Sequence, residues 1–237
     1  LSTVIWNINR QNPDLKLYEF GHCYYYNKSG QSYPKADNYI EKASLDLFIS
    51  GNTNRQTWNS NSNLTGFFNI KSSVEMILSR LGIKPESLNT GESDKKYFAE
   101  SLTYISNNKA LVEAGRISKS YLMKFDIGQD VYYAHIDWDL LLKMIRTHSI
   151  SFSELPKYPS VRRDLALLLD WGIQLVQIRE IALKTDRNIL HVGNLFAVYH
   201  SDSLGKNKQS YAVSFILRDD LKTRPDKTTE TVISKSK

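Results

Sequence analysis

Apolar residues in the first 150 positions recur with two different spacings, which predicts strands mixed with helices. A period of two, typical of a strand with one buried face, relates Ala43, Leu45, Leu47 and Ile49. Helical spacing relates Ile70, Val74, Ile77, Leu78 and Leu81, and Gly82 and Pro85 follow where that helix should end. Further strands are predicted over residues 15–26, 97–105, 109–117 and 131–137, with an exposed loop over 52–65 and a short helix over 139–146. We expect a mixed α+β layer with an antiparallel sheet.

The pattern from residue 151 onward predicts a second, smaller unit. Strands are predicted over 164–170, 190–200 and 210–218, a helix over 173–185 separates the first two, and a further helix begins within 226–237. The first helix carries Leu175, Ile178, Ile181 and Ala182 on one stripe, and a strand bulge is expected at Gly193 and Asn194. The order β-α-β-β-α is that of a split βαβ ferredoxin-like unit without its last strand. The boundary is expected within 147–159, so the predicted domains are 1–150 and 151–237.

Residues 158–170 open this second unit with a turn, a charged cluster and an apolar run. Pro159 fixes the entry to the strand, and Arg162, Arg163 and Asp164 follow it. The run is rich in Leu and bounded by Asp at each end, which predicts a strand buried on both faces. The arginines could contact phosphate, but one of them is expected to pair with Asp164 or with an acid of the other domain.

Alternation along the last predicted strand separates a core face from an open face. Tyr211, Val213, Phe215 and Leu217 should point toward the helices, and Ser210, Ala212, Ser214 and Arg218 should point away. On the neighbouring strand Phe196 and Val198 suit the core side, which leaves Ala197 and Tyr199 on the open side. An open sheet face with an aromatic ring, hydroxyls and a cation is how ferredoxin-like folds bind unstacked RNA bases. The alternative is that Tyr199 packs under a loop or another domain.

Composition is that of an ordinary globular protein of 237 residues, 41% hydrophobic and 24% charged. No apolar run approaches the roughly 20 residues that cross a bilayer, so no membrane partner is expected. The single cysteine, Cys23, excludes an intrachain disulfide and fits a reducing cytoplasm. Net charge is +6, of which +4 lies after residue 150, a bias that permits nucleic-acid binding and equally fits plain solubility. The amino end lacks Met and a signal-peptide layout, so an internal cut through a larger protein is expected.

No set of residues in the sequence predicts an active site or a metal site. The five histidines lack metal-ligand spacing, and there is no glycine-rich phosphate loop. His22 and Cys23 are adjacent on a predicted strand and should face opposite ways. Asp139 is expected to cap a helix. We expect the chain to be non-catalytic by itself.

Residues 158–170 resemble the opening strand of the anticodon-binding domain of phenylalanyl-tRNA synthetases, with its Tyr/Phe-Pro and Arg-Asp-Leu-Ala signature. The resemblance continues through 195–199 and 208–212, up to Arg218 and Thr223. Upstream, residues 15–24 are similar to the Leu-Phe-Glu-Ile-Gly strand of the bacterial β subunit, and 115–117, 125–127 and 133–137 fit its catalytic-like module. The resemblance covers nearly the whole chain in the family's order.

The resemblance implies part of an α₂β₂ enzyme, phenylalanine–tRNA ligase, located in the cytoplasm. Its α subunit, with ATP and Mg²⁺, makes phenylalanyl-adenylate and transfers the acyl group to tRNA(Phe). The chain would supply a non-catalytic class II synthetase-like module over 1–150, packed against α, and an anticodon-binding domain over 151–237. It would bind no cofactor, metal or DNA of its own.

Site residues are also implied by the resemblance. Tyr199 would stack on an anticodon base, Ser210 would hydrogen-bond nearby, and Arg218 would add a contact. Lys206 and Lys208 would contact phosphates, and Pro159, Arg162, Arg163 and Asp164 form the structural signature. The family's usual Asp, two residues before the Tyr, is replaced by Ala197, so one base-edge hydrogen bond is missing.

Two alternatives compete with this interpretation. A single-chain organellar synthetase would share the anticodon domain, but its ATP motifs would precede that domain in the same chain, and here they do not. A non-enzymatic protein-interaction module would use the open sheet face to dock a partner subunit.

Overall fold

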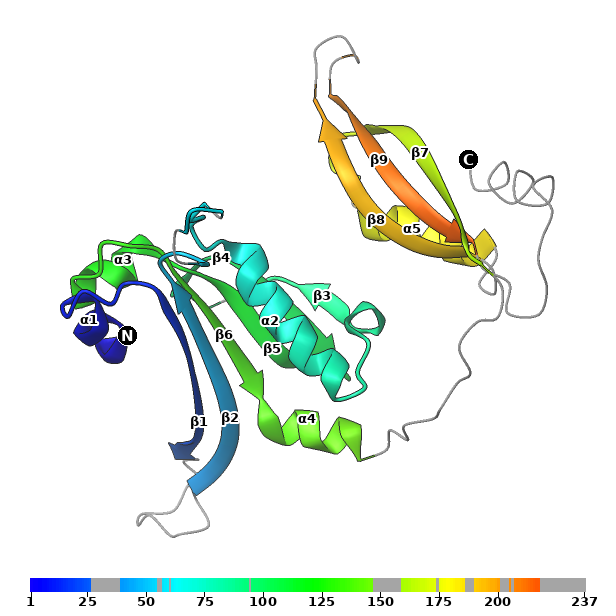
Figure 1. Cartoon of the computed structure of the whole chain (residues 1–237). Helices are drawn as coiled ribbons and strands as arrows, with labels where there is room; N and C mark the ends of the chain where they lie inside the picture. Colours follow the sequence, from blue (N-terminus) through cyan, green and yellow to red (C-terminus); the bar gives the residue numbers. More distant parts are fainter. Residues whose placement is uncertain are drawn as a thin grey trace. The chain divides into compact units, whose positions relative to one another are not determined.

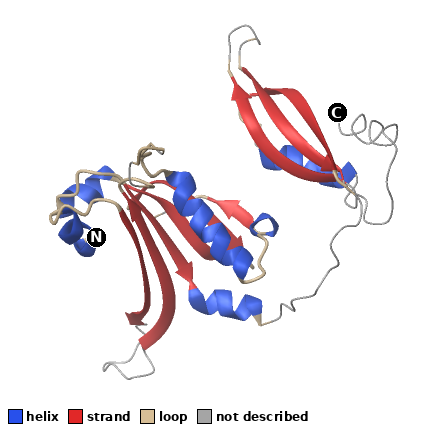
Figure 2. Ribbon diagram, viewed as in Figure 1, coloured by secondary structure: helices blue, strands red, loops and turns tan. Residues whose placement is uncertain are grey.

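The computed structural model describes residues 1–26, 39–54, 57–59, 61–93, 95–146, 159–173, 175–185, 190–200, 205 and 207–217. The chain divides into two compact units, Leu1–Ser151 and Phe152–Lys237. Figures 1 and 2 show the helices and strands of each unit. Among the described residues no helix combines the length and apolarity needed to span a bilayer.

The first unit is built on one antiparallel sheet, as predicted. Its strands lie side by side in the order β1-β2-β6-β5-β4-β3 (Figure 1). The strands are β1 (Leu15–Tyr26), β2 (Tyr39–Ser50), β3 (Asn89–Gly91), β4 (Phe98–Ser106), β5 (Lys109–Ile117) and β6 (Val131–Asp137). The helical elements are α1 (Ser2–Ile8), α2 (Phe67–Arg80), η2 (Pro85–Ser87), α3 (Lys119–Leu122), η3 (Met123–Phe125) and α4 (Trp138–Ile145).

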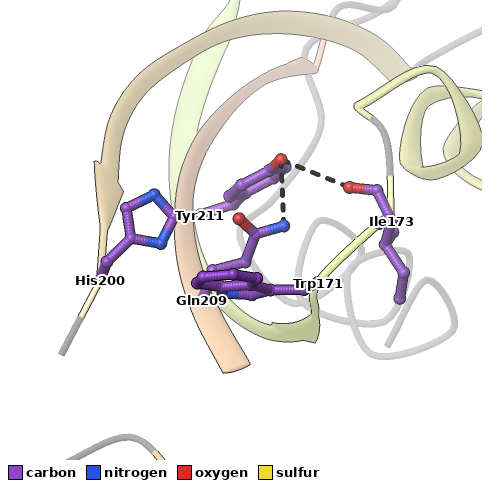
Figure 3. A pocket seen from close by; sticks show the side chains of 6 residues that line it. Trp171, Ile173, His200, Gln209 and Tyr211 are labelled. Atoms are coloured by element: carbon purple, nitrogen blue, oxygen red, sulfur yellow. Dashed lines mark hydrogen bonds between the residues drawn. The ribbon is translucent and has the colours of Figure 1, made fainter. Parts of the chain in front are cut away.

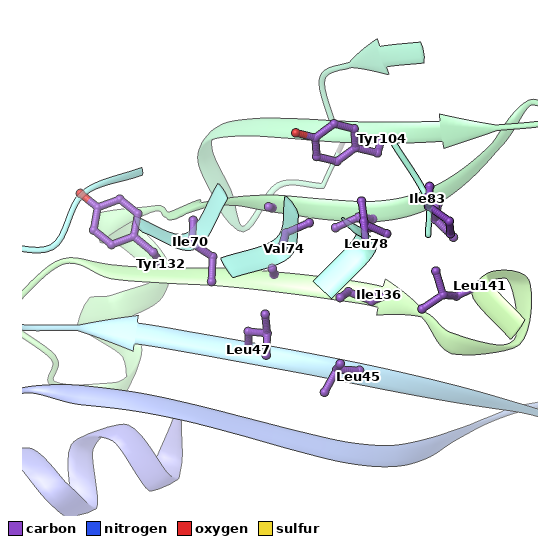
Figure 4. Close-up of a cluster of buried hydrophobic side chains, with 14 of the residues drawn as sticks. Leu45, Leu47, Ile70, Val74, Leu78, Ile83, Tyr104, Tyr132, Ile136 and Leu141 are labelled. Atoms are coloured by element: carbon purple, nitrogen blue, oxygen red, sulfur yellow. The ribbon is translucent and has the colours of Figure 1, made fainter. Parts of the chain in front are cut away.

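The core of this unit lies between α2 and one face of the sheet (Figure 4). The period-two positions Leu45, Leu47 and Ile49 of β2 are all buried there. The helical-period positions Ile70, Val74 and Leu78 meet the sheet from α2 and are fully buried. Burying one such side chain stabilises the fold by about 1.5–3 kcal/mol. The apolar rows of β2 and α2 that bury each other therefore hold α2 on the sheet.

The ends of two helices show how single residues set the boundaries. Gly82 follows α2 with φ +81°, a left-handed conformation that glycine adopts without strain, and it ends the helix as predicted. α4 begins one residue earlier than expected, so the capping residue is Asp137, whose Oδ1 accepts the Leu140 amide at 2.8 Å. The prediction that Asp139 caps this helix is therefore wrong. Asp139 Oδ2 instead accepts the amide of Ala43 in β2 at 3.0 Å.

The second unit has the predicted ferredoxin-like order β-α-β-β over its described residues. The elements are β7 (Val161–Asp170), α5 (Leu175–Thr185), β8 (Leu190–Tyr199) and β9 (Lys208–Leu217), and the antiparallel strand order is β7-β9-β8. The core contains Ala182 of α5 and Val213, Phe215 and Leu217 of β9. The helix predicted within 226–237 lies outside the described residues.

Two burial predictions for this unit are wrong. β7 is not buried on both faces: half-buried and exposed residues alternate along its whole length, and Leu168 is 54% exposed. The reason is that α5 packs on one face only, so the other face of a Leu-rich strand meets solvent. Ile181 was placed on the buried stripe of α5 but is exposed, because that stripe is centred on Leu175, Ile178 and Ala182.

Gly115 of β5 gives a test of packing in the first unit. A Cβ on this residue would lie 2.3 Å from the carbonyl oxygen of Glu100 and 2.7 Å from the Phe98 ring. We predict that Gly115→Ala forces β4 away from β5 and lowers the free energy of unfolding by about 1–3 kcal/mol in urea titrations. Gly21→Ala in β1 is the control, because a Cβ there meets nothing within 4 Å. Equal stability of the two variants would contradict this account.

Candidate nucleic-acid interface

One face of the three-stranded sheet is covered by no described helix, and its composition follows from the strand register. Residues that pair directly across an antiparallel sheet share a face. Three alanines, Ala166, Ala212 and Ala197, pair in a row across all three strands. The next row along the sheet contains Leu168, Ser210 and Tyr199. A planar group stacked on Tyr199 would therefore lie beside a row whose side chains project little above the backbone.

Tyr199 ends β8 and lies opposite Ser210, with 59% of its surface exposed. Val198 pairs with Tyr211 and so belongs to the helix-covered face. The predicted faces of Ala197, Val198 and Tyr199 are confirmed. This placement leaves the Tyr199 ring accessible for stacking.

Phe196 lies on the open face, contrary to prediction. β8 carries two register shifts, between Val192 and Leu195 and between Leu195 and Ala197, and these break the simple alternation. Phe196 is 49% exposed, and the Arg162 guanidinium of β7 lies 5.5 Å from its ring centroid. The bulge expected at Gly193 and Asn194 is confirmed, and the second shift, at Phe196, was not predicted.

Ser214 is buried rather than part of the open polar surface. It is 5% exposed, and its Oγ accepts the amide of Asn194 at 2.9 Å and donates to the Asn194 carbonyl at 3.2 Å. The hydroxyl thus satisfies backbone groups that the bulge removes from the strand ladder. Ser214 supports the shape of the face and leaves Ser210 as the hydroxyl nearer to Tyr199.

The charged signature residues do not form one cluster. Arg162 and Asp164 share the open face, where Nε lies 2.8 Å from Oδ1 and Nη2 lies 3.3 Å from Oδ2, which confirms the predicted pairing. Arg163 lies opposite Phe215 and so faces the other way. Pro159 is exposed just before β7.

The predicted phosphate ligands are only partly described. Lys208 begins β9 with Nζ 3.9 Å from Asp170 Oδ1, and both side chains are exposed. Such a pair is worth about 0–1 kcal/mol, so Lys208 can exchange its partner for a phosphate at little cost. Lys206 and Arg218 lie outside the described residues.

The first unit holds a polar cluster that sequence reasoning missed, centred on Asp46 of β2. Asp46 Oδ1 lies 2.8 Å from His135 Nδ1 and accepts the Tyr133 hydroxyl at 2.7 Å, while Oδ2 accepts Ser44 Oγ at 2.9 Å. The only sequence signal was a carboxylate between two apolar positions of a strand. Because both carboxylate oxygens are already used, the cluster is a satisfied structural network.

Hydrogen bonds dominate the ionisation of this cluster. The bond to Asp46 raises the pKa of His135, against the burial that lowers it. Burial raises the pKa of Asp46, but the bonds from His135 and Tyr133 outweigh it and the net pKa is lowered. In the described part of the chain, no three or more His, Cys, Asp or Glu side chains gather as a metal site. His22 Nε2 lies 3.8 Å from Glu41 Oε1. His22 and Cys23 are consecutive in β1 and face opposite sides of the sheet.

A β-α-β-β unit with a solvent-exposed aromatic and a hydroxyl on its sheet face belongs to the ferredoxin-like class that includes RNA-binding domains. The family model described as ferredoxin-fold anticodon binding domain matches residues 156–237. The model described as phenylalanyl tRNA synthetase beta chain CLM domain matches residues 1–138. The chain therefore belongs to the phenylalanyl-tRNA synthetase beta chain family.

Curated relatives agree along the whole chain. The phenylalanine–tRNA ligase beta subunit of Bacteroides thetaiotaomicron is 38% identical, over 99% of this chain and 29% of the relative. The corresponding subunit of Porphyromonas gingivalis is 33% identical, with the same two coverages. The chain thus spans less than a third of the length of these relatives. A solved structure of pyrrolysyl-tRNA synthetase from Desulfitobacterium hafniense shares 14% identity at a TM-score of 0.42, over 65% of this chain and 52% of that one, too little to add to the assignment.

The Asp46–His135 pair predicts a defined pH dependence of stability. A raised His135 pKa stabilises the fold below about pH 6.5, and this contribution is lost as pH rises through the folded value. A lowered Asp46 pKa stabilises above about pH 4 and is lost as pH falls through the folded value. We predict that His135→Gln lowers the free energy of unfolding by about 1–3 kcal/mol between these limits, and by less once pH rises above the folded pKa of His135.

Urea titrations across this pH range measure the effect. His22→Gln is the matched control, because that histidine is exposed and makes only a 3.8 Å approach to Glu41. A stability difference for His135→Gln that does not change with pH would rule out the ion pair as its cause.

Proposed function

We propose that this chain is part of a β subunit of phenylalanine–tRNA ligase and binds the anticodon stem-loop of tRNA(Phe) through the open face of its second unit. The observation that carries the proposal is Tyr199, exposed opposite Ser210 within the segment matched by the anticodon-binding model. In this proposal residues 151–237 are the RNA-binding domain and residues 1–150 are a non-catalytic class II synthetase-like module.

The contacts follow from the chemistry of the face. An unpaired anticodon base stacks on the Tyr199 ring, and the Ser210 hydroxyl, directly opposite, hydrogen-bonds its edge. Ala197 and Ala212 beside them leave room for the base, and Ala197 offers no carboxylate at its own position, so we assign edge recognition to Ser210. Lys208 contacts a phosphate, and we extend the same role to Lys206 and a further RNA contact to Arg218 on the strength of the family resemblance.

We assign ATP and Mg²⁺ to a catalytic α subunit, and we propose an α₂β₂ assembly in the cytoplasm. The described residues offer Mg²⁺ no cluster of three or more His, Cys, Asp or Glu side chains. The carboxylate of Asp46 is occupied by His135, Tyr133 and Ser44. The first unit accordingly serves to support α rather than to react.

Exposed apolar side chains on the same sheet face favour one alternative, the docking of a partner protein. Leu168 and Phe196 are each about half exposed beside Tyr199 and Arg162. Salt dependence separates the two functions, because phosphate contacts make RNA affinity fall steeply as salt rises.

We predict that Tyr199→Ala weakens binding of the tRNA(Phe) anticodon stem-loop by about 1–3 kcal/mol, the worth of one stacked base. Tyr199→Phe keeps the ring and should bind nearly as the parent does. Fluorescence anisotropy with a labelled hairpin at two salt concentrations gives the dissociation constants. Tyr18→Ala, which removes an exposed tyrosine from the first unit, is the control. An unchanged affinity for Tyr199→Ala would refute the proposed RNA contact.

We also predict that the chain alone does not exchange pyrophosphate into ATP in the presence of phenylalanine. Adding a purified α subunit to a complete β subunit should restore that exchange and aminoacylation. Exchange by the chain alone, at a level that scales with its concentration, would overturn the non-catalytic assignment.

A further inference from the structure

A hollow of about 680 Å³ lies at the end of the three-stranded sheet, on the face that α5 covers. It is lined by Trp171, Gly172 and Ile173 after β7, His200 after β8, and Gln209 and Tyr211 at the start of β9. Figure 3 shows Gln209 and Tyr211 together, with His200 on one side of them and Ile173 on the other. The volume falls within the range of small-ligand sites, about 300–1,000 Å³.

The lining combines accessible aromatic rings with polar atoms that are already oriented. The Trp171 indole is 64% exposed, and its ring meets the His200 ring edge-on at 6.1 Å. The Tyr211 hydroxyl donates to the Ile173 carbonyl and accepts from Gln209 Nε2, both at 3.3 Å. Gln209 is only 8% exposed, so this network fixes its amide group. Aromatic surface beside a fixed amide is the combination by which proteins hold an unstacked base.

Strand geometry connects this hollow to Tyr199. Successive residues of a strand point to opposite faces, and consecutive Cα atoms are about 3.8 Å apart. Tyr199 and His200 are consecutive, as are Gln209 and Ser210. At this end of the sheet, Tyr199 and Ser210 therefore face one side while His200 and Gln209 face the other. β8 is an edge strand among the described strands, so a nucleic-acid strand passing its end meets both surfaces.

We propose that the hollow binds a second unstacked RNA base, adjacent to the one on Tyr199, with Trp171 as its stacking surface, His200 at its side and Gln209 as its edge contact. This inference rests on the proposed RNA-binding function. A nucleobase is favoured over a phosphate because the described lining contains no Lys or Arg. It is favoured over an aliphatic side chain because the hollow contains two oriented polar groups, the Gln209 amide and the Tyr211 hydroxyl.

The test uses the full 237-residue chain and the tRNA(Phe) anticodon stem-loop, intact and with each loop nucleotide in turn made abasic. We expect Trp171→Ala to weaken binding of the intact hairpin by about 5- to 150-fold, with the salt dependence unchanged. One abasic position should weaken binding by the parent chain but should not further weaken binding by the Trp171→Ala variant. That position should differ from the one that has no further effect on the Tyr199→Ala variant. Trp171→Phe should keep most of the affinity. Trp58→Ala, in an exposed loop of the first unit, is the control.

Two results would overturn the inference. In the first, Trp171→Ala binds as the parent chain does while Tyr199→Ala does not, so that only the hollow is rejected. In the second, Trp171→Ala loses the same factor on every abasic hairpin, which indicates a general structural effect. Thermal melting of each variant identifies loss of fold, and in that case His200→Ala replaces Trp171→Ala in the same coupling test. If Tyr199→Ala also leaves affinity unchanged, the proposed RNA-binding function itself fails.

Discussion

The second unit depends on one constraint, the antiparallel pairing of β9 with a strand on each side. β9 is central, so its alternation assigns every neighbouring side chain to one of two faces. Val213, Phe215 and Leu217 take the side that α5 covers, and their burial holds the helix in place. The strand register places the alanine row and Tyr199 on the opposite side. The stability of the unit and the chemistry of its open face thus come from the same strand.

The first unit divides its two sheet faces differently. One face is apolar and buried beneath α2, while the other carries the network of Asp46 beside a second apolar cluster that includes Leu15 and Val131. On that second face the acid and its hydrogen-bond partners satisfy one another, which stabilises the sheet. In the proposed function, this sheet belongs to the module that supports the catalytic subunit.

Periodicity predicted most elements because each has one covered face and a regular repeat, as in β2 and α2. The errors arose where a contact distant in sequence decides the outcome. The leucines of β7 do not show by themselves that only one layer covers the strand, and the face of Phe196 depends on a register shift between Leu195 and Ala197. Asp46 was missed because its partners come from β6. The expected site residues came from family resemblance, whereas the Trp171 hollow required three chain segments to be brought together.

The bulge held by Ser214 also has a consequence for how this domain tolerates changes in chain length. A strand without the extra residue beside Asn194 could still pair with β9 before and after that point. Every side chain before the deletion would, however, emerge on the opposite side of the sheet from its present one. An insertion or deletion there preserves the strand but, unlike a length change in a loop, moves side chains from one face of the sheet to the other. Within β8, the exact number of residues therefore determines which side chains reach the open face, and hydrophobicity alone does not show this.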